Sequence, residues 1–115
     1  MVGSHLVDFL LENTDWTIHG LCRWNDDFSN LNHIIPRINT GDRISLVYGD
    51  LNDYPSLQRA VDISKPDYVF HLAADFERST ETYNFWDSNF KNNVLASHNL
   101  MQQVTKYDSL KKIIF

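Results

Sequence analysis

The sequence is poor in several residue types, and each shortage narrows what the protein can be. It has one cysteine, Cys22, in 115 residues, which excludes an internal disulfide and favours a reducing cytoplasm. Ten Lys and Arg against fifteen Asp and Glu give a formal net charge of −5, so the chain is a poor partner for nucleic acid. It contains neither an apolar run of membrane-spanning length nor a signal-peptide pattern. We therefore predict a soluble cytoplasmic protein that binds neither nucleic acid nor membranes.

Residues that could form a metal site are also scarce. The five histidines do not show metal-site spacing, and a single cysteine is available to join them. We predict no metal site. His71 falls inside a predicted strand, where packing is the expected role rather than catalysis. No nucleophile–base pair is evident, which argues against a hydrolase.

The residues that are present indicate a folded α/β chain. Hydrophobic residues make up 43% of the sequence and aromatic residues 13%, which is typical of a globular domain. Periodicity predicts helices over 4–13, 54–64 and 89–104, and strands over 17–23, 44–48, 68–72 and 112–115. Asp53 is the expected N-cap of the second of these helices, and a short helix over 31–35 is expected to end at Pro36. This alternation predicts a parallel sheet with helices on both faces.

Five short motifs occur in a fixed order: MVGSHLVDFLLE, HGLCRW, YGDLND, YVFHLAA and NVLASHNLMQQV. Together they resemble the extended short-chain dehydrogenase/reductase family of nucleotide-sugar epimerases and dehydratases. The HGLCR and YGDLND stretches are most similar to GDP-mannose 4,6-dehydratases. The resemblance implies a partial Rossmann-type doubly wound parallel sheet. Residues 1–115 would form an incomplete NAD(P)-binding domain that lacks the first strand and the C-terminal substrate domain.

The resemblance also explains how the sequence starts and ends. In the family, a buried strand and a GxxGxx turn precede the position of Gly3, the third glycine, which lets the helix pack closely on the sheet. A catalytic Ser/Thr and a Tyr-x-x-x-Lys pair would follow the last residue. We expect a segment without catalytic residues. Either a truncation of the sequence or a mis-assigned start codon would explain its beginning.

Tyr107 and Lys111 have the four-residue spacing of the family's catalytic pair. The working pair needs helical geometry, so that both side chains share a face. Asp108 and Ser109 between them are turn formers, which predicts surface residues at a helix end instead.

Loss of the first strand removes the centre of the expected 3-2-1-4-5 order. The gap left behind would be about 10 Å, or two strand spacings. Unpaired strand edges cost stability and favour aggregation, so we expect a chain of marginal stability.

Arg23 closes the strand predicted over 17–23. An arginine near this position of a dinucleotide-binding fold can contact the 2′-phosphate of NADP. The nearby Asp26 and Asp27 would oppose a phosphate, and a solvated arginine at a strand end is the alternative. We expect NADP as the cofactor, with NAD as the alternative.

The resemblance implies that the Asp50 carboxylate accepts a hydrogen bond from the adenine amine and that Leu51 packs on the ring. For Asp50, a turn-forming role is the alternative. Asn93 matches a cofactor-site asparagine of the family, and a solvent-facing helix residue is its alternative.

Leu72, Ala73 and Ala74 resemble the family stretch that passes beneath the cofactor, where small side chains let the backbone approach it. A tightly packed strand end would also select alanine. The family commonly continues with Gln-Ser, whereas this chain has Asp75-Phe76, and this departure leaves the substrate open.

These features predict a fragment of an NAD(P)-dependent nucleotide-sugar 4,6-dehydratase or epimerase that supplies part of the cofactor pocket. The resemblance implies that the complete enzyme would bind a nucleotide sugar, oxidise it at C4 and, in a dehydratase, eliminate water across C5–C6. The resemblance leaves a homo-oligomer open. The alternatives are a non-catalytic dinucleotide-binding or interaction module, and a flavodoxin-like or receiver domain, which would need phosphate loops or clustered acids.

Overall fold

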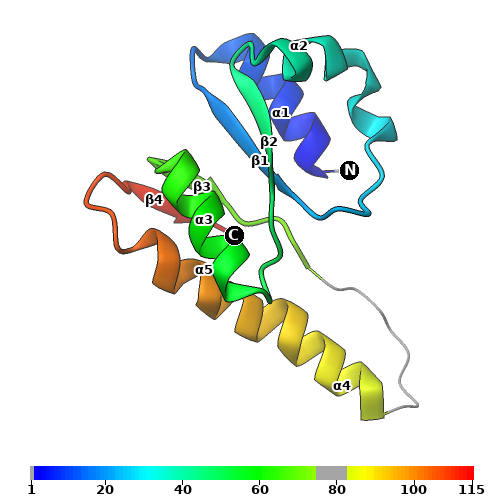
Figure 1. Cartoon of the computed structure of the whole chain (residues 1–115), viewed down its shortest axis with the longest axis vertical. Coiled ribbons are helices and arrows are strands. Elements are labelled where there is room, and N and C mark those ends of the chain that lie inside the picture. The colour runs from blue at the N-terminus through cyan, green and yellow to red at the C-terminus, as the bar shows by residue number, and fades with distance from the viewer. Residues whose placement is uncertain (1, 75–82) are drawn as a thin grey trace. The chain divides into compact units, whose positions relative to one another are not determined.

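The computed structural model describes residues 2–74 and 83–115. The chain divides into two compact units, Met1–Gly49 (unit 1) and Asp50–Phe115 (unit 2). Each unit has its own pair of parallel strands (Figure 1). Each unit also has its own hydrophobic core. The predicted α/β class with parallel strands is therefore confirmed. The Asp75-Phe76 departure lies outside the described residues.

Unit 1 is built from three helical segments and two strands. Its elements are α1 (Val2–Asn13), β1 (Ile18–Cys22), the 3₁₀ helix η1 (Ser29–Ile34), α2 (Ile35–Thr40) and β2 (Ile44–Tyr48). The strands pair in parallel with Ile18 opposite Ile44. Leu11 of α1, Ile34 of η1 and Ile44 of β2 form the buried core, so the helical segments share one apolar cluster with the sheet.

Arg43 ties the end of α1 to the start of β2. Its Nη1 donates to the Leu11 carbonyl at 3.1 Å, and its Nη2 donates to the Thr14 carbonyl. The last carbonyls of a helix have no partner within the helix and carry partial negative charge. The Arg43 guanidinium supplies both hydrogen-bond donors and positive charge to these carbonyls, which stabilises the turn between α1 and β1.

Pro36 begins a helix rather than ending one, so that prediction was wrong. Helix η1 ends at Ile34, and α2 then starts with Pro36 in its first turn. Proline is tolerated there because first-turn N–H groups have no acceptor within the helix. Gly41 is the C-cap residue of α2; it adopts φ 69° and donates its N–H to the carbonyls of Arg37 and Ile38.

Unit 2 is built from a second parallel pair of strands and a long helical segment. Its elements are α3 (Tyr54–Ser64), β3 (Tyr68–Phe70), α4 (Tyr83–Asn89), the π-helix η2 (Phe90–Leu95), α5 (Ala96–Val104) and β4 (Lys112–Ile114). Its core consists of Leu57 and Val61 from α3 with Leu100 and Val104 from α5. Val69 and Ile113 of the strands pack against this core, so α3 and α5 cover the β3–β4 pair.

The last predicted helix starts earlier than its hydrophobic pattern indicates. The α4–η2–α5 segment begins at Tyr83, whereas periodicity predicts a start near 89. Trp86 and Phe90 are 75% and 60% exposed, and none of residues 86–90 is buried. Over 86–90 there is therefore no buried stripe for periodicity to detect. At α3, Asp53 is the N-cap residue as predicted, but its side chain makes no capping hydrogen bond.

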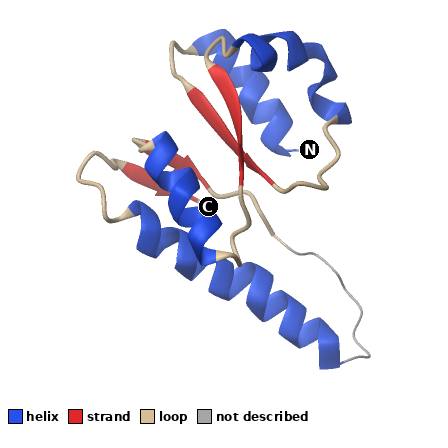
Figure 2. Cartoon of the chain, viewed as in Figure 1, coloured by secondary structure: helices blue, strands red, loops and turns tan. Residues whose placement is uncertain are grey.

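The strands form two separate two-stranded sheets, β1–β2 and β3–β4 (Figure 2). In the family order 3-2-1-4-5, strands 2 and 3 are neighbours and so are strands 4 and 5. The β1–β2 and β3–β4 pairs correspond to these two neighbouring pairs. No strand pairing joins the two sheets within 2–74 and 83–115. None of the helices in this described part has the length and apolar character needed to cross a bilayer.

Candidate functional site

Asp50 opens the turn that leads into α3. Its Oδ1 accepts the Asn52 N–H at 2.8 Å, and its own N–H donates to Ser56 Oγ at 3.0 Å. The residue is exposed. The turn-forming role is therefore present, and it leaves the carboxylate at the surface. The neighbouring Leu51 is half-buried and packs against the core of unit 2.

This turn is attached to the long helical segment by two amide contacts. Asn52 Nδ2 donates to Asn92 Oδ1 at 2.9 Å, and Asn99 Nδ2 donates to the Leu51 carbonyl at 3.1 Å. Asn92 and Asn99 are about two turns apart, or about 10 Å along a helix. Neither asparagine is among the residues predicted from the sequence, because side-chain amides on a helix carry no spacing signal of their own.

The end of β3 is attached to the same stretch of helix through His71. Its Nε2 lies 2.7 Å from Ser97 Oγ, and the Ser97 hydroxyl donates to the Asn93 carbonyl at 2.6 Å. With the serine proton committed to that carbonyl, His71 Nε2 is the donor. The ring also meets Phe115 edge-on, with centroids 5.8 Å apart. His71 is therefore packed, as predicted, and burial lowers the pKa of its imidazole.

Leu72, Ala73 and Ala74 follow His71 and are exposed. The alternative of a tightly packed strand end is therefore wrong for the two alanines. Asn93 lies on η2, half-buried, and its Nδ2 donates to Asn89 Oδ1 at 3.1 Å. Segments of π-helix are frequent at functional sites. Unit 2 thus brings the Asp50 turn, the end of β3 and the Asn93 segment together.

Unit 1 contains the other two predicted residues. Gly3 is half-buried in the first turn of α1, and Arg23 directly follows β1. Arg23 is 3.0 Å from the Asp26 carboxylate through Nη2, and Cys22 beside it is buried. Burial raises the pKa of the Cys22 thiol, and the Asp26 charge adds to this effect. The thiol is therefore not an activated nucleophile.

Two aromatic rings stack at the carboxyl ends of β1 and β2. Trp24 lies over Tyr48 with centroids 4.2 Å apart and planes 3° apart. Trp24 is 78% exposed, so the stack covers little of its surface. Neither residue is among those predicted from the sequence, although aromatic residues at the ends of neighbouring parallel strands are a usable signal.

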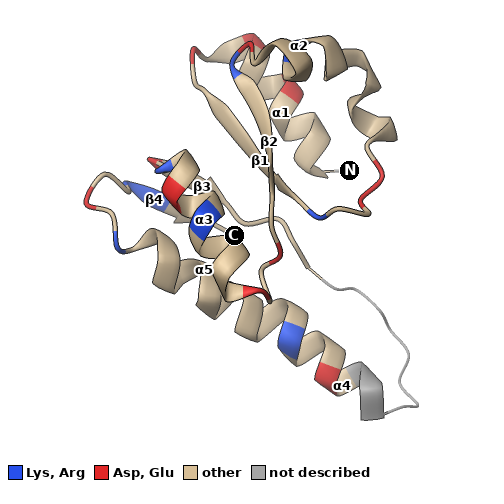
Figure 3. Ribbon diagram, viewed as in Figure 1, with Lys and Arg blue, Asp and Glu red and all other residues tan. Residues whose placement is uncertain are grey.

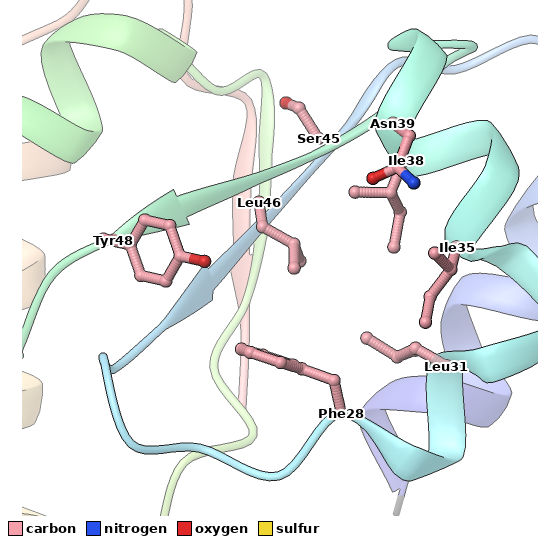
Figure 4. A pocket seen from close by; sticks show the side chains of 8 residues that line it. All are labelled: Phe28, Leu31, Ile35, Ile38, Asn39, Ser45, Leu46 and Tyr48. Carbon is pink, nitrogen blue, oxygen red and sulfur yellow. The ribbon is translucent and has the colours of Figure 1, made fainter.

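Unit 1 also has an apolar pocket of about 390 Å³ between β2 and the η1–α2 segment (Figure 4). Leu31 and Leu46 point toward one another across it (Figure 4). Its walls are formed by Phe28, Leu31, Ile35, Ile38, Asn39, Ser45, Leu46 and Tyr48. None of the predicted site residues is among them.

Tyr107 and Lys111 do not form a catalytic pair. Both lie outside the helices, the Tyr107 hydroxyl bonds to Asp62, and Lys111 Nζ lies 5.8 Å from the Tyr68 ring centroid. The hydrogen bond to Asp62 raises the pKa of Tyr107, the opposite of what a catalytic tyrosine needs. No group of three or more potential metal ligands occurs in the described ranges.

The GDP-mannose 4,6 dehydratase family model matches residues 1–115. Among curated proteins, GDP-mannose 4,6 dehydratase 1 of Arabidopsis thaliana is 45% identical over 76 residues, 63% of this chain and 21% of that protein. The Drosophila melanogaster GDP-mannose 4,6 dehydratase is 36% identical over 76 residues, 63% of this chain and 19% of that protein. The match thus spans about a fifth of these relatives.

Solved structures show the same fold. A UDP-glucose 4-epimerase from Thermotoga maritima, crystallised with UDP-glucose, superposes with a TM-score of 0.72 at 26% identity, over 100% of this chain and 34% of that one. The Bordetella bronchiseptica enzyme WbmH, in complex with NAD⁺, gives 0.60 at 22% identity, over 91% and 32%. Together with the family match, the Rossmann-like fold places this chain in the GDP-mannose 4,6-dehydratase family of extended short-chain dehydrogenase/reductases.

Proposed function

We propose that residues 1–115 are an incomplete NAD(P)-binding domain that supplies part of the cofactor pocket of a nucleotide-sugar 4,6-dehydratase. The observation that carries the proposal is the attachment of two segments to one helical stretch. The Asp50 turn is held through Asn92, and the end of β3 is held through Ser97. In open α/β folds, ligands bind where the chain leaves the carboxyl ends of parallel strands.

The residues in this region fit a nicotinamide dinucleotide. The exposed carboxylate of Asp50 can accept a hydrogen bond from an adenine amine, and the half-buried Leu51 can cover one side of the ring. Ala73 and Ala74 are exposed and small, so a ligand can approach their backbone. Leu72 and Asn93 are the other residues of unit 2 that we assign to cofactor binding.

In unit 1, Gly3 would let the start of α1 lie close to the sheet, and Arg23 would contact the 2′-phosphate of NADP. An arginine offers a planar fork of donors that suits phosphate. We therefore propose NADP rather than NAD as the cofactor.

When bound, the nicotinamide ring would accept a hydride from the sugar and return it. This chain's own residues would bind and orient the dinucleotide, and we assign none of them a catalytic role.

The GDP-mannose 4,6-dehydratase family match supports a nucleotide sugar as substrate of the complete protein. The buried Cys22 thiol suits a reducing cytoplasm, where we place this function.

Thermal unfolding with NADP⁺ and NAD⁺ tests the proposal. A nucleotide at 100 times its dissociation constant should stabilise the chain by about 2.7 kcal/mol. Asp50→Asn keeps an oxygen for the Asn52 N–H but turns the adenine acceptor into an amide, so the stabilisation should fall. Asp53→Asn is the matched control, because it removes the same charge in the same turn and should keep the full shift.

A cooperative transition that neither nucleotide shifts would contradict the proposal. It would favour the alternative of a non-catalytic interaction module. Equal losses of the nucleotide shift in Asp50→Asn and Asp53→Asn would show that net charge, rather than a specific contact at Asp50, governs binding.

A further inference from the structure

Asp26 occupies the donors of Arg23 that a phosphate would use. Arg23 Nε donates to Asp26 Oδ1 at 3.0 Å, and Nη2 lies 3.0 Å from the same oxygen. The Arg23 backbone N–H donates to Asp26 Oδ2 at 2.7 Å. Three N–H groups converging on one carboxylate is an arrangement that binds anions. The anion in this structure is part of the chain itself.

This ion pair lies near the surface and can therefore open. The Arg23 side chain is 65% exposed and the Asp26 side chain is 30% exposed. Ion pairs between exposed side chains contribute little net stability, so an incoming anion can replace the carboxylate. If the carboxylate stays in place, its charge repels that anion across a short distance.

The adjacent Asp27 has the same charge but a different role. Its two oxygens accept the Ser29 N–H at 2.9 Å and the Ser29 hydroxyl at 3.0 Å, at the start of η1. Figure 3 shows a basic segment followed by an acidic one along the loop after β1. Asp27 is therefore a natural control for charge in the same loop.

We propose that Asp26 sets the preference between the two nicotinamide dinucleotides by competing with the 2′-phosphate for Arg23. This inference rests on the proposed dinucleotide-binding function. The 2′-hydroxyl of NAD is uncharged and can bind while the Arg23–Asp26 pair stays closed. A 2′-phosphate must displace Asp26 or bind beside its charge, so Asp26 reduces the preference for NADP that Arg23 provides.

The test uses adenosine 2′,5′-bisphosphate and adenosine 5′-monophosphate, which differ only in the 2′-phosphate. Calorimetry would give both dissociation constants for the 115-residue chain, for Asp26→Asn and for Asp27→Asn. In Asp26→Asn, the amide oxygen can still accept an Arg23 N–H, which preserves the loop. We expect the preference for the bisphosphate to rise about five-fold in Asp26→Asn, the size of a favourable exposed ion pair. It should stay within about two-fold in Asp27→Asn, and added salt should reduce the difference.

The double variant Arg23→Gln/Asp26→Asn separates competition from general charge. If Asp26 acts through Arg23, the Asp26→Asn gain disappears in the Arg23→Gln background. Equal gains in Asp26→Asn and Asp27→Asn, or an unchanged preference in Asp26→Asn, would overturn the inference while leaving nucleotide binding intact. Failure of all the proteins to bind either probe would overturn the proposed function, and this inference with it.

Discussion

Single polar residues of the candidate site are held mainly by one another. Asn52 bonds to Asn92, and His71 bonds to Ser97, which in turn bonds to the Asn93 carbonyl. Partly buried polar groups cost free energy when they lack partners. These contacts therefore fix where the site segments lie. A change in the charge of one of these residues should lower the free energy of unfolding.

Protonation of His71 should lower the stability of unit 2. Burial lowers the pKa of His71 in the folded chain, whereas the pKa of a histidine in an unfolded chain is about 6.5. The stabilising effect of the neutral ring is therefore complete above that pH and declines as the pH falls toward the folded-state pKa. Urea unfolding at pH 8 and pH 5 should show a larger loss of unfolding free energy in the wild type than in His71→Gln.

His98→Gln measures the effect of removing an exposed imidazole from the same helical segment. Parallel losses in the wild type and His71→Gln between the two pH values would rule out His71 as the group responsible.

Elements in this chain are ended and joined by specific backbone features. Helix α2 is capped by Gly41 in the left-handed region, and Arg43 follows at φ 63°. The long helix of unit 2 contains the π-helical segment η2, in which Asn93 lies. The hydrophobic pattern of the sequence does not predict left-handed residues or π-helical segments.

Gly41→Ala should destabilise the chain by about 1 kcal/mol, because a residue with a Cβ is disfavoured in the left-handed region. A Cβ at Gly41 would meet no atom within 4 Å, so backbone strain alone would account for the loss. Urea or thermal unfolding measures it. Gly41→Asn should lose less, since asparagine tolerates this region. Equal losses in the two variants would contradict a backbone origin.

The whole molecule consists of two small cores, each beside a two-stranded sheet. In the described part, every strand has one edge without a strand partner. Isolated pairs of strands are marginal, and open edges template pairing between chains. Association between copies of the chain is the expected consequence.

Leu21→Lys should reduce this association. Leu21 lies on β1 and is 42% exposed, and a lysine on an edge strand opposes pairing with another chain. Sedimentation velocity over a range of concentrations should show fewer large species in the variant. Ile63→Lys, on α3 at 58% exposure, is the matched control. A similar reduction in the control would attribute association to surface hydrophobicity rather than to strand edges.

The sequence by itself determined the elements and their class. Periodicity located β1, β2, α3 and the core residue Val104 closely, because burial of one face imposes a repeat on local sequence. Motif order indicated the family, and the cofactor residues that we propose rest on the same motifs. The local pattern failed at Pro36, because a proline can either end one helix or occupy the first turn of the next.

Tertiary structure alone decided which side chains meet. Asn52 and Asn92 are 40 residues apart in sequence, and His71 and Ser97 are 26 apart. No local pattern encodes such contacts, since they arise when helices pack on the strands and leave polar groups facing one another. The commitment of Arg23 to Asp26 is local in sequence, yet it too needed structure, because spacing cannot say which of two neighbouring aspartates the guanidinium selects.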